Sequence, residues 1–327
     1  MRRLFVILVW ILVAQSPASA ATQTPRIQRV SFQGRDYVKV SSWAPIAGLT
    51  PRWLTPDKEL QLQNNKVTLH LSHDSRRIRC NGVWVWLSAP ILMRDRDALL
   101  PYLDIATTLN PILAPTQTRR PVRLICLDPG HGGDDTGKRQ AGRHEKEYTL
   151  LLAKELGKLL TRSGYKVVLT RSTDRRVERM DRPLMARQAK ADLFISLHYN
   201  GADVPSAQGV EVYSLTPAGA SSTNAGGEGA DHPVCVGNSW NERNMQLAFL
   251  MQKALVQRLG REDRGARRAR FEVLREATMP AVLIEGAFMS NPSEARWIYS
   301  STERTRLAQA IVDGVKSYEK WIGVTAR

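Results

Sequence analysis

The chain has 327 residues, of which 43% are hydrophobic and 24% are charged. This composition is typical of folded globular proteins and excludes a largely disordered chain, and the length allows two domains. The formal net charge of +16 favours anionic partners, such as an envelope polymer, a lipid surface or nucleic acid.

The first residues have the order of regions found in a secretory signal peptide. Arg2 and Arg3 precede an apolar stretch from Leu4 to Ala14, and Ala18-Ser19-Ala20 forms a small-residue processing site. The stretch is too short to span a bilayer, so a membrane anchor is the weaker interpretation. We predict that residues 1–20 are a signal peptide and that the mature chain has no membrane span and is exported to the periplasm or cell envelope. Export makes nucleic acid a poor partner.

The chain has three cysteines. Cys126 lies within an apolar run and is predicted to be a buried thiol. Whether Cys80 and Cys235 pair in a disulfide is left open by their spacing.

Residues 27–113 contain short alternating segments with turn residues between them, including 26–34, 66–72 and 82–88, and these predict strands. Trp84 and Trp86 would share one strand face, where core packing or stacking on sugar would explain them. The segment CNGVWVWLSAPILMRDRDALLPYLDIATTL, residues 80–109, resembles the small α+β amine-oxidase N-terminal domain. We therefore predict an accessory α+β domain over 27–113. The proline-rich stretch 110–121 predicts a boundary, with the linker at 114–121.

Strand-like and helix-like segments alternate after the linker. Apolar runs at 123–128, 166–170, 192–197, 210–215 and 281–285 predict buried strands. Helical spacing predicts a helix between the first two runs, ended by Gly164, and others at 179–190, 243–260 and 303–321. The alternation predicts an α/β layered domain over residues 122–322.

Polar residues with ligand chemistry follow or end several of these segments. His131 and His198 each follow a predicted strand, Glu285 ends another, and Glu145 opens the long helix. Because ligands bind at the carboxyl edges of strands in open α/β sheets, we expect these four side chains to meet at one rim. Two histidines and one carboxylate form a ligand set for catalytic zinc that leaves a fourth position for water.

Residue type alone does not decide which carboxylate is the ligand. Glu145 opens a helix, where the positive end of the helix dipole favours an anion. Glu285 ends an apolar strand, where partial burial would raise its pKa toward the range useful for a general base. Glu145 as ligand and Glu285 as base is therefore the better assignment.

Four ordered motifs resemble the zinc-dependent N-acetylmuramoyl-L-alanine amidases of the amidase-3 type. They are LDPGHGGDDTG, HEKEYTLLLAKEL, ADLFISLHYNG and MPAVLIEGAFMSNPSEA, and the resemblance covers about residues 122–322. It implies a three-layer α/β/α sandwich with a mixed central sheet, zinc held by His131, Glu145 and His198, and Glu285 as the catalytic residue. It also implies peptidoglycan as substrate, cut between the muramic acid lactyl group and L-alanine. An activating protein partner is left open.

One interval of this domain needs its own hypothesis. Residues 219–244 are rich in glycine and serine and predict a surface loop. This loop would border the cleft, with His232 or Cys235 reaching the metal; a spacer with no role is the alternative.

Two other functions compete with the amidase prediction. A zinc hydrolase could keep the site and act on another peptide or acylated amine. A non-catalytic, basic wall-binding protein would need a degenerate site, which the presence of all four residues disfavours.

Overall fold

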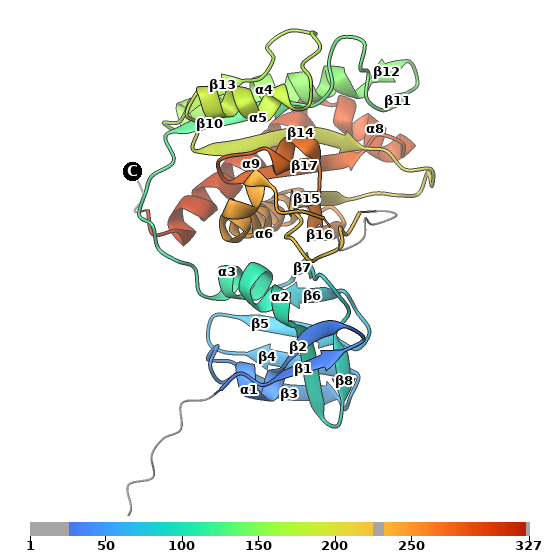
Figure 1. The fold of residues 1–327 in the computed structure, drawn as a ribbon. Helices are drawn as coiled ribbons and strands as arrows, with labels where there is room; N and C mark the ends of the chain where they lie inside the picture. Colours follow the sequence, from blue (N-terminus) through green and yellow to red (C-terminus); the bar gives the residue numbers. More distant parts are fainter. Residues whose placement is uncertain (1–25, 225–231, 325–327) are drawn as a thin grey trace, which may run out of the picture.

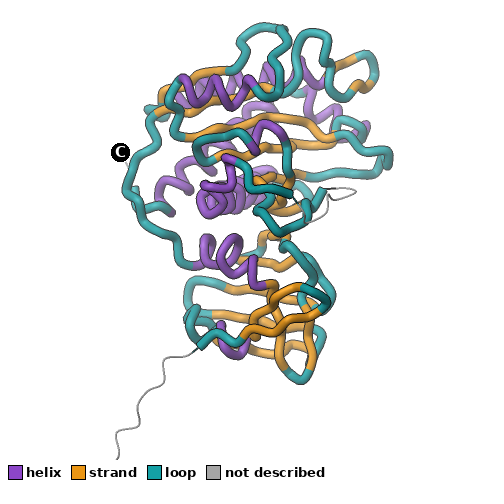
Figure 2. The backbone as a smooth tube through the Cα atoms, in the orientation of Figure 1, coloured by secondary structure: helices purple, strands orange, loops and turns teal. Residues whose placement is uncertain are grey.

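The computed structural model describes residues 26–224 and 232–324, so the predicted signal peptide lies outside the described residues. The chain passes from a strand-rich lower part to a layered upper part (Figure 1). One sheet connects the two, and Figure 2 shows its strands in both parts.

The central sheet has eleven strands in the order β13-β10-β14-β17-β15-β16-β7-β6-β5-β4-β3. In the upper part, β10 pairs in parallel with β13 and β14, and β14 with β17, whereas β15 runs antiparallel to β17 and parallel to β16. The sheet is therefore mixed. The upper strands are β10 (Leu124–Pro129), β13 (Lys166–Leu169), β14 (Leu193–Asn200), β15 (Val210–Leu215), β16 (Asp263–Ala269) and β17 (Ala281–Phe288).

Helices cover both faces of the upper sheet. On one face, α4 (Glu145–Arg162), α6 (Asn241–Leu259) and α9 (Ser301–Trp321) contribute to the larger apolar core. On the other face, α5 (Asp181–Gln188) and α7 (Glu272–Arg275) enclose a smaller core with residues such as Phe194 and Leu283. The predicted α/β/α sandwich with a mixed sheet and a small α+β part before it is confirmed. The remaining elements here are β11 (Arg139–Gln140), β12 (Arg143–His144), the 3-10 helix η2 (Val236–Trp240) and α8 (Pro292–Tyr299).

The predicted helices and strands lie close to their observed positions because local signals end them. Gly164 follows α4 with a φ of +89°, and Gly260 caps α6 with a φ of +63°. At the start of α9, the Ser300 side chain accepts a hydrogen bond from the backbone N–H of Glu303.

The lower part has two sheets. Five of its strands extend the central sheet, and the other four form a second sheet in the order β1-β2-β9-β8. The elements are β1 (Arg29–Phe32), β2 (Arg35–Lys39), α1 (Val40–Trp43), β3 (Thr50–Thr55), β4 (Glu59–Gln63), β5 (Thr68–Ser72), β6 (Arg77–Cys80), β7 (Val83–Trp86), β8 (Leu92–Arg94), β9 (Asp97–Pro101), α2 (Tyr102–Asp104), the π-helix η1 (Ile105–Leu109) and α3 (Asn110–Leu113).

The proline-rich stretch begins with a short helix that its sequence did not indicate. Residues 110–113 form the short helix α3, because Pro111 sits in its first turn, where a missing N–H costs nothing. Residues 114–121 lack helix and strand, as expected of the linker. The domain boundaries stay a prediction, and the sheet itself is continuous across them through the pairing of Ala266 on β16 with Val85 on β7.

No helix in the described part of the chain is both long enough and apolar enough to cross a membrane. The three cysteines are free thiols, so Cys80 and Cys235 do not pair. Cys126 is 1% exposed, and the prediction of a buried thiol is confirmed.

Candidate metal centre

The four predicted site residues line one cleft of about 450 Å³. His131 follows β10, His198 lies on β14 and Glu285 on β17. Because these strands are parallel neighbours, their carboxyl ends meet at one edge of the sheet. Glu145 reaches the same edge as the first residue of α4.

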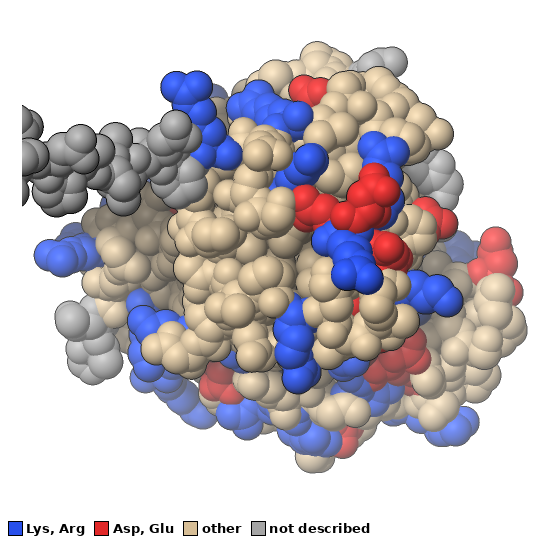
Figure 3. Space-filling view, turned by 90° about the horizontal axis from the view of Figure 1, so that it is seen from below, with Lys and Arg blue, Asp and Glu red and all other residues tan. Residues whose placement is uncertain are grey.

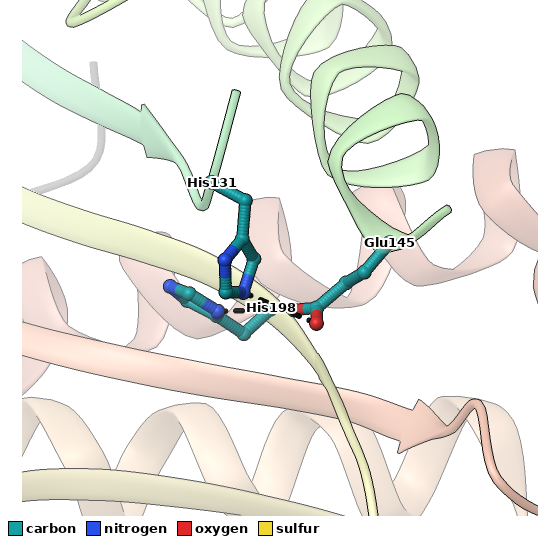
Figure 4. Close-up of side chains that lie close together, drawn as sticks. All are labelled: His131, Glu145 and His198. Atoms are coloured by element: carbon teal, nitrogen blue, oxygen red, sulfur yellow. Dashed lines mark hydrogen bonds and ion pairs between the residues drawn. The ribbon is translucent and has the colours of Figure 1, made fainter. Parts of the chain in front are cut away.

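Three of these side chains come together as a donor cluster, which Figure 4 shows in close-up. His131 Nε2 lies 3.1 Å from Glu145 Oε2, and His198 Nδ1 lies 3.0 Å from Glu145 Oε1. The imidazole centroids are 4.9 Å apart and the rings are nearly perpendicular. One ligand atom from each of the three residues lies within 4.8 Å of the others.

The spacing of these atoms fits a zinc ion. Nitrogen and oxygen ligands at about 2.0–2.1 Å from a tetrahedral zinc lie about 3.3 Å from one another. The two nitrogen–oxygen separations, 3.0 and 3.1 Å, are close to that value. Two imidazoles and a carboxylate are also a donor set that zinc prefers, and three protein ligands leave a position open.

The electrostatics of the cluster keep Glu145 ionised. Burial raises the pKa of Glu145, but hydrogen bonds from His131 and His198, and their charges, outweigh burial and hold the pKa well below its usual range. Burial lowers the pKa of His131, whereas its hydrogen bond to Glu145 and the charges of Glu145 and Asp135 raise it more. The cluster therefore contains an ionised carboxylate, which attracts a cation.

Neighbouring groups fix the orientation of the ligands. His131 Nδ1 lies 2.9 Å from Asp135 Oδ1, which leaves Nε2 directed at Glu145. The backbone N–H groups of Lys138 and Tyr199 donate to the two Glu145 oxygens. Such second partners set the tautomer and direction of metal ligands. Sequence reasoning missed Asp135; an acidic residue four positions after His131 in a glycine-rich turn was the available signal.

Asp128 supports the histidine turn indirectly. Its buried carboxylate accepts hydrogen bonds from Thr170, Ser196 and Arg182, none of which is an imidazole. Arg182 in turn donates to the backbone carbonyl of His131. The turn that carries His131 is therefore held by a buried ion pair.

Loss of that ion pair should destabilise the protein. In Arg182→Met the carboxylate of Asp128, 0% exposed, loses its partner 2.9 Å away. Breaking such a buried pair costs about 3–5 kcal/mol of unfolding free energy, and urea denaturation would measure it. Arg187→Met, at an exposed position of the same helix, is the control and should change the unfolding free energy by less than about 0.5 kcal/mol. Equal midpoints for the two variants would refute this assignment.

A glycine is required at position 130 because the backbone there lies close to the His198 imidazole. A Cβ at this residue would lie 2.2 Å from His198 Cε1 and 2.4 Å from its Nε2. Gly130→Ala must therefore displace the His198 ring, and we expect any catalytic rate of this site to fall at least about tenfold, since an ångström of misplacement can cost about 100-fold. The matched control is Gly157→Ala, where the nearest atom would be 3.7 Å away. Full activity in Gly130→Ala would show that the ring position is not critical.

Glu285 lies beside the donor cluster but is not part of it. It is the register partner of His198 across β14 and β17, and of Glu211 across β17 and β15. Its Oε2 atom is buried and has no hydrogen-bond partner among the described residues. Burial first, and then the charges of Glu145 and Glu211, raise the pKa of Glu285 well above its usual range.

Other polar residues near these motifs lie outside the donor cluster. His144 Nδ1 contacts Glu147 at 3.5 Å. Asn200 lines the cleft and donates to Glu211, whereas Arg187 is exposed on α5 and is not a lining residue. Part of the 219–244 interval, residues 225–231, lies outside the described residues. Within the described residues the cluster includes neither His232 nor Cys235, whose thiol contacts the Pro233 carbonyl.

Comparison with protein families gives a match to the upper part of the chain. Residues 125–317 match the family described as N-acetylmuramoyl-L-alanine amidase, which is more than half of the sequence. All four predicted site residues fall within this segment.

Two curated relatives and one solved structure show the extent of the similarity. The chain is 36% identical over 199 residues to the probable cell wall amidase LytH of Staphylococcus epidermidis, covering 60% of this chain and 58% of LytH. It is 36% identical over 242 residues to the N-acetylmuramoyl-L-alanine amidase AmiC of Neisseria meningitidis, covering 67% of this chain and 58% of AmiC. The chain thus spans less than two thirds of either relative. A crystal structure of an N-acetylmuramoyl-L-alanine amidase from Clostridium difficile 630 matches with a TM-score of 0.51 and 31% identity, covering 60% of this chain and 96% of that one.

Proposed function

Because the chain belongs to the N-acetylmuramoyl-L-alanine amidase family, we propose that it is a zinc-dependent peptidoglycan hydrolase. It cuts the amide bond between the lactyl group of N-acetylmuramic acid and L-alanine of the stem peptide. The observation that carries this proposal is the His131–Glu145–His198 donor cluster, in one cleft with the buried, unpartnered carboxyl oxygen of Glu285.

We assign zinc binding to His131 through Nε2, to His198 through Nδ1 and to the Glu145 carboxylate. When bound, the ion supplies Lewis-acid polarisation of the scissile carbonyl and makes water a stronger acid near neutral pH. Glu145 accepts backbone hydrogen bonds at both oxygens, from the N–H groups of Lys138 and Tyr199, so the chain holds this ligand rigidly. The hydrogen bond to Asp135 holds His131 in a single ring orientation.

Glu285 is assigned as the general base and acid. Its raised pKa means that the carboxyl holds a proton more readily than an exposed one, and a cation in the adjacent cluster would lower that pKa. A group poised near the working pH can take a proton from the attacking water and pass it to the leaving amine of L-alanine. Because Oε2 has no partner among the described residues, this oxygen is free for those transfers.

The cleft also suits an anionic substrate. Arg179 and Arg270 line it together with the site residues, and Arg179 is 72% exposed at its side chain. Stem peptides carry carboxylates, which a guanidinium can bind in a bidentate manner. The exposed Arg179 therefore supports a peptide-bearing glycan over a neutral amide, whereas Arg270 is buried and donates to the carbonyls of Pro217 and Ala220.

The predictions about export and about domain organisation are also part of the proposal. Residues 1–20 direct export, and the mature chain acts in the periplasm or cell envelope, in keeping with relatives named as cell wall amidases. Residues 27–113, with their amine-oxidase-like module, form an accessory domain joined through 114–121 to the amidase domain at 122–322.

One experiment tests the central proposal. Purified mature protein would be assayed for bound metal and for release of dye from labelled sacculi, with and without a chelator. Mass spectrometry of the products should find intact stem peptides freed from glycan. Release of other fragments would favour a different hydrolase, and binding without turnover in the zinc-loaded protein would favour a non-catalytic wall-binding protein.

A further inference from the structure

Six side chains of the central sheet alternate between arginine and aromatic rings. The Cζ atoms of Arg79 and Arg77 lie 5.0 and 4.8 Å from the centroid of the Trp84 ring. Arg77 and Arg267 lie 5.6 and 4.6 Å from the Trp86 centroid, and Arg267 lies 5.3 Å from that of Tyr213. These are cation–π distances. The set, called here the arginine–aromatic ladder, comprises Arg79, Trp84, Arg77, Trp86, Arg267 and Tyr213.

The ladder lies on the same face and the same row of the sheet as the cleft. β17 and β15 pair Glu285 with Glu211, and β15 and β16 pair Glu211 with Gly265. On β7, Trp84 and Trp86 flank Gly265: a Cβ there would lie 2.9 Å from the Trp84 carbonyl oxygen and 3.0 Å from Trp86 Cδ1. Only a glycine at this position lets the Trp84 backbone and the Trp86 ring lie so close to β16. The row of sheet positions that contains the proposed base thus continues into β7.

The pairing of β6 with β7 extends this row further. Arg79 is the register partner of Trp84, and Arg77 is the partner of Trp86. Partners in adjacent strands present their side chains on one face. Three strand spacings separate β17 from β7, which is roughly 14 Å.

The two ends of the ladder differ in how their charges are satisfied. Arg267 is 7% exposed and pairs with Glu211 at 2.6 Å, and the Tyr213 hydroxyl donates to the same carboxylate. Arg77 and Arg79 are exposed and form no ion pair with a carboxylate of the described residues. Stacking uses the faces of the guanidinium groups, and apart from Arg79 Nε, which donates to the Gly82 carbonyl, their N–H groups remain for a ligand.

The exposed arginines have no packing role in the core. Ile78 and Cys80 alternate with Arg77 and Arg79 on β6, and these two apolar side chains, 0% and 1% exposed, carry the core contacts from the opposite face. At the end of the molecule seen from below, Lys and Arg side chains lie among Asp and Glu (Figure 3). The net positive charge is therefore not gathered there into one patch, whereas the ladder concentrates cations in line with the cleft.

We propose that the arginine–aromatic ladder binds the carboxylate-bearing peptidoglycan strand next to the stem peptide that is cut. The proposal rests on the proposed function. Preorganised guanidinium edges bind the carboxylates of neighbouring stem peptides, and the exposed parts of Trp84 and Trp86 offer apolar surface to the sugar rings. The scissile amide would lie at Glu285 and a neighbouring part of the strand at the exposed end of the ladder on β6 and β7, while the ladder members between them, Arg267 and Tyr213, are buried.

The first test measures binding without turnover. Purified peptidoglycan, stripped of phosphate polymers, is sedimented with Glu285→Gln protein that also carries Arg77→Gln and Arg79→Gln. Two ion pairs with carboxylates of the peptidoglycan are lost, so we expect about fivefold weaker binding and a smaller salt dependence. The control, Arg94→Gln with Arg96→Gln, removes the same charge from exposed positions at β8 in the other sheet and should bind like the parent.

The second test separates binding from folding and chemistry. In active protein, the ratio of the rate on sacculi to the rate on one soluble muropeptide should fall about fivefold in Arg77→Gln with Arg79→Gln. The corresponding double lysine variant keeps the charge but loses the planar stack, and it should recover part of the ratio. A loss of thermal stability with an unaltered ratio would mean that the ladder only joins the two parts of the sheet.

The outcomes distinguish this proposal from the proposed function. If sacculi are cut but the glutamine variant binds them like its control, the ladder proposal is overturned and the amidase stands. If the variant loses binding while wild type never cuts the amide, the ladder stands and the enzymatic assignment fails. Wild-type binding that disappears when phosphate polymers are stripped would also overturn the ladder proposal, because the ligand would then be phosphate.

Discussion

Glu285→Gln is expected to lose turnover by a factor of about 10²–10⁴ while the purified protein keeps its metal. Glutamine has the size of glutamate but cannot accept a proton from water and return it to an amine. Glu285 lies outside the donor cluster, so the three ligands stay in place. Its Oε2 has no hydrogen-bond partner among the described residues, and the substitution therefore breaks no hydrogen bond of that atom.

The measurement is hydrolysis of labelled sacculi alongside elemental analysis of zinc. Glu276→Gln is the matched control, because Glu276 follows α7 and is not a lining residue of the cleft. It should hydrolyse at close to the wild-type rate. Loss of zinc in Glu285→Gln would make Glu285 a ligand instead of a base, and retention of more than a tenth of the activity would remove it from the mechanism.

Buried strands of the upper sheet could be predicted because parallel strands covered on both faces are continuous apolar runs. β16 was missed since its sequence, DRGARRA, has almost no apolar residues. Two of its three arginines are nevertheless buried: Arg267 pairs with Glu211, and Arg268 donates to Thr108 Oγ1. These partners lie more than 50 residues away in the sequence, and no local pattern shows them.

The helix α8 was missed for a different reason. Its signal was present, because Asn291 precedes Pro292 at the first helical position, and the Asn291 side chain accepts hydrogen bonds from the N–H groups of Ser293 and Glu294. The apolar periodicity over eight residues was too short to draw attention to it. Capping residues are thus informative where periodicity is weak.

The composition of the candidate site could be predicted, but its internal geometry could not. The ends of predicted parallel strands placed His131, His198 and Glu285 near one edge. The register that sets His198 opposite Glu285, and Glu211 beyond it, depends on pairing between strands far apart in the chain. Asp135 is directed at His131 by a turn in which His131 itself has a φ of +61°, and apolar periodicity cannot predict such a turn.

His131→Ala is expected to lose both zinc and activity, in contrast to the loss of activity alone in Glu285→Gln. Removing Nε2 leaves two protein donors for the ion, and the loss of affinity should exceed the ~10–100-fold effect of removing an outer partner of a ligand. The protein should then purify with less than about a tenth of the wild-type zinc. Hydrolysis of sacculi should fall to the level of the chelator-treated wild type.

Two further variants make this a graded test of the donor cluster. His144→Ala removes an imidazole next to Glu145 that contacts Glu147 instead, so zinc content and rate should stay near wild type. Asp135→Asn keeps all three ligands but weakens the hold on the His131 ring, and zinc affinity should fall by about 10–100-fold. The expected order of zinc affinity is therefore wild type and His144→Ala, then Asp135→Asn, then His131→Ala. If His131→Ala retained zinc as tightly as His144→Ala, the ion would have to bind elsewhere, and the short His131–Glu145 and His198–Glu145 contacts would be ordinary buried hydrogen bonds.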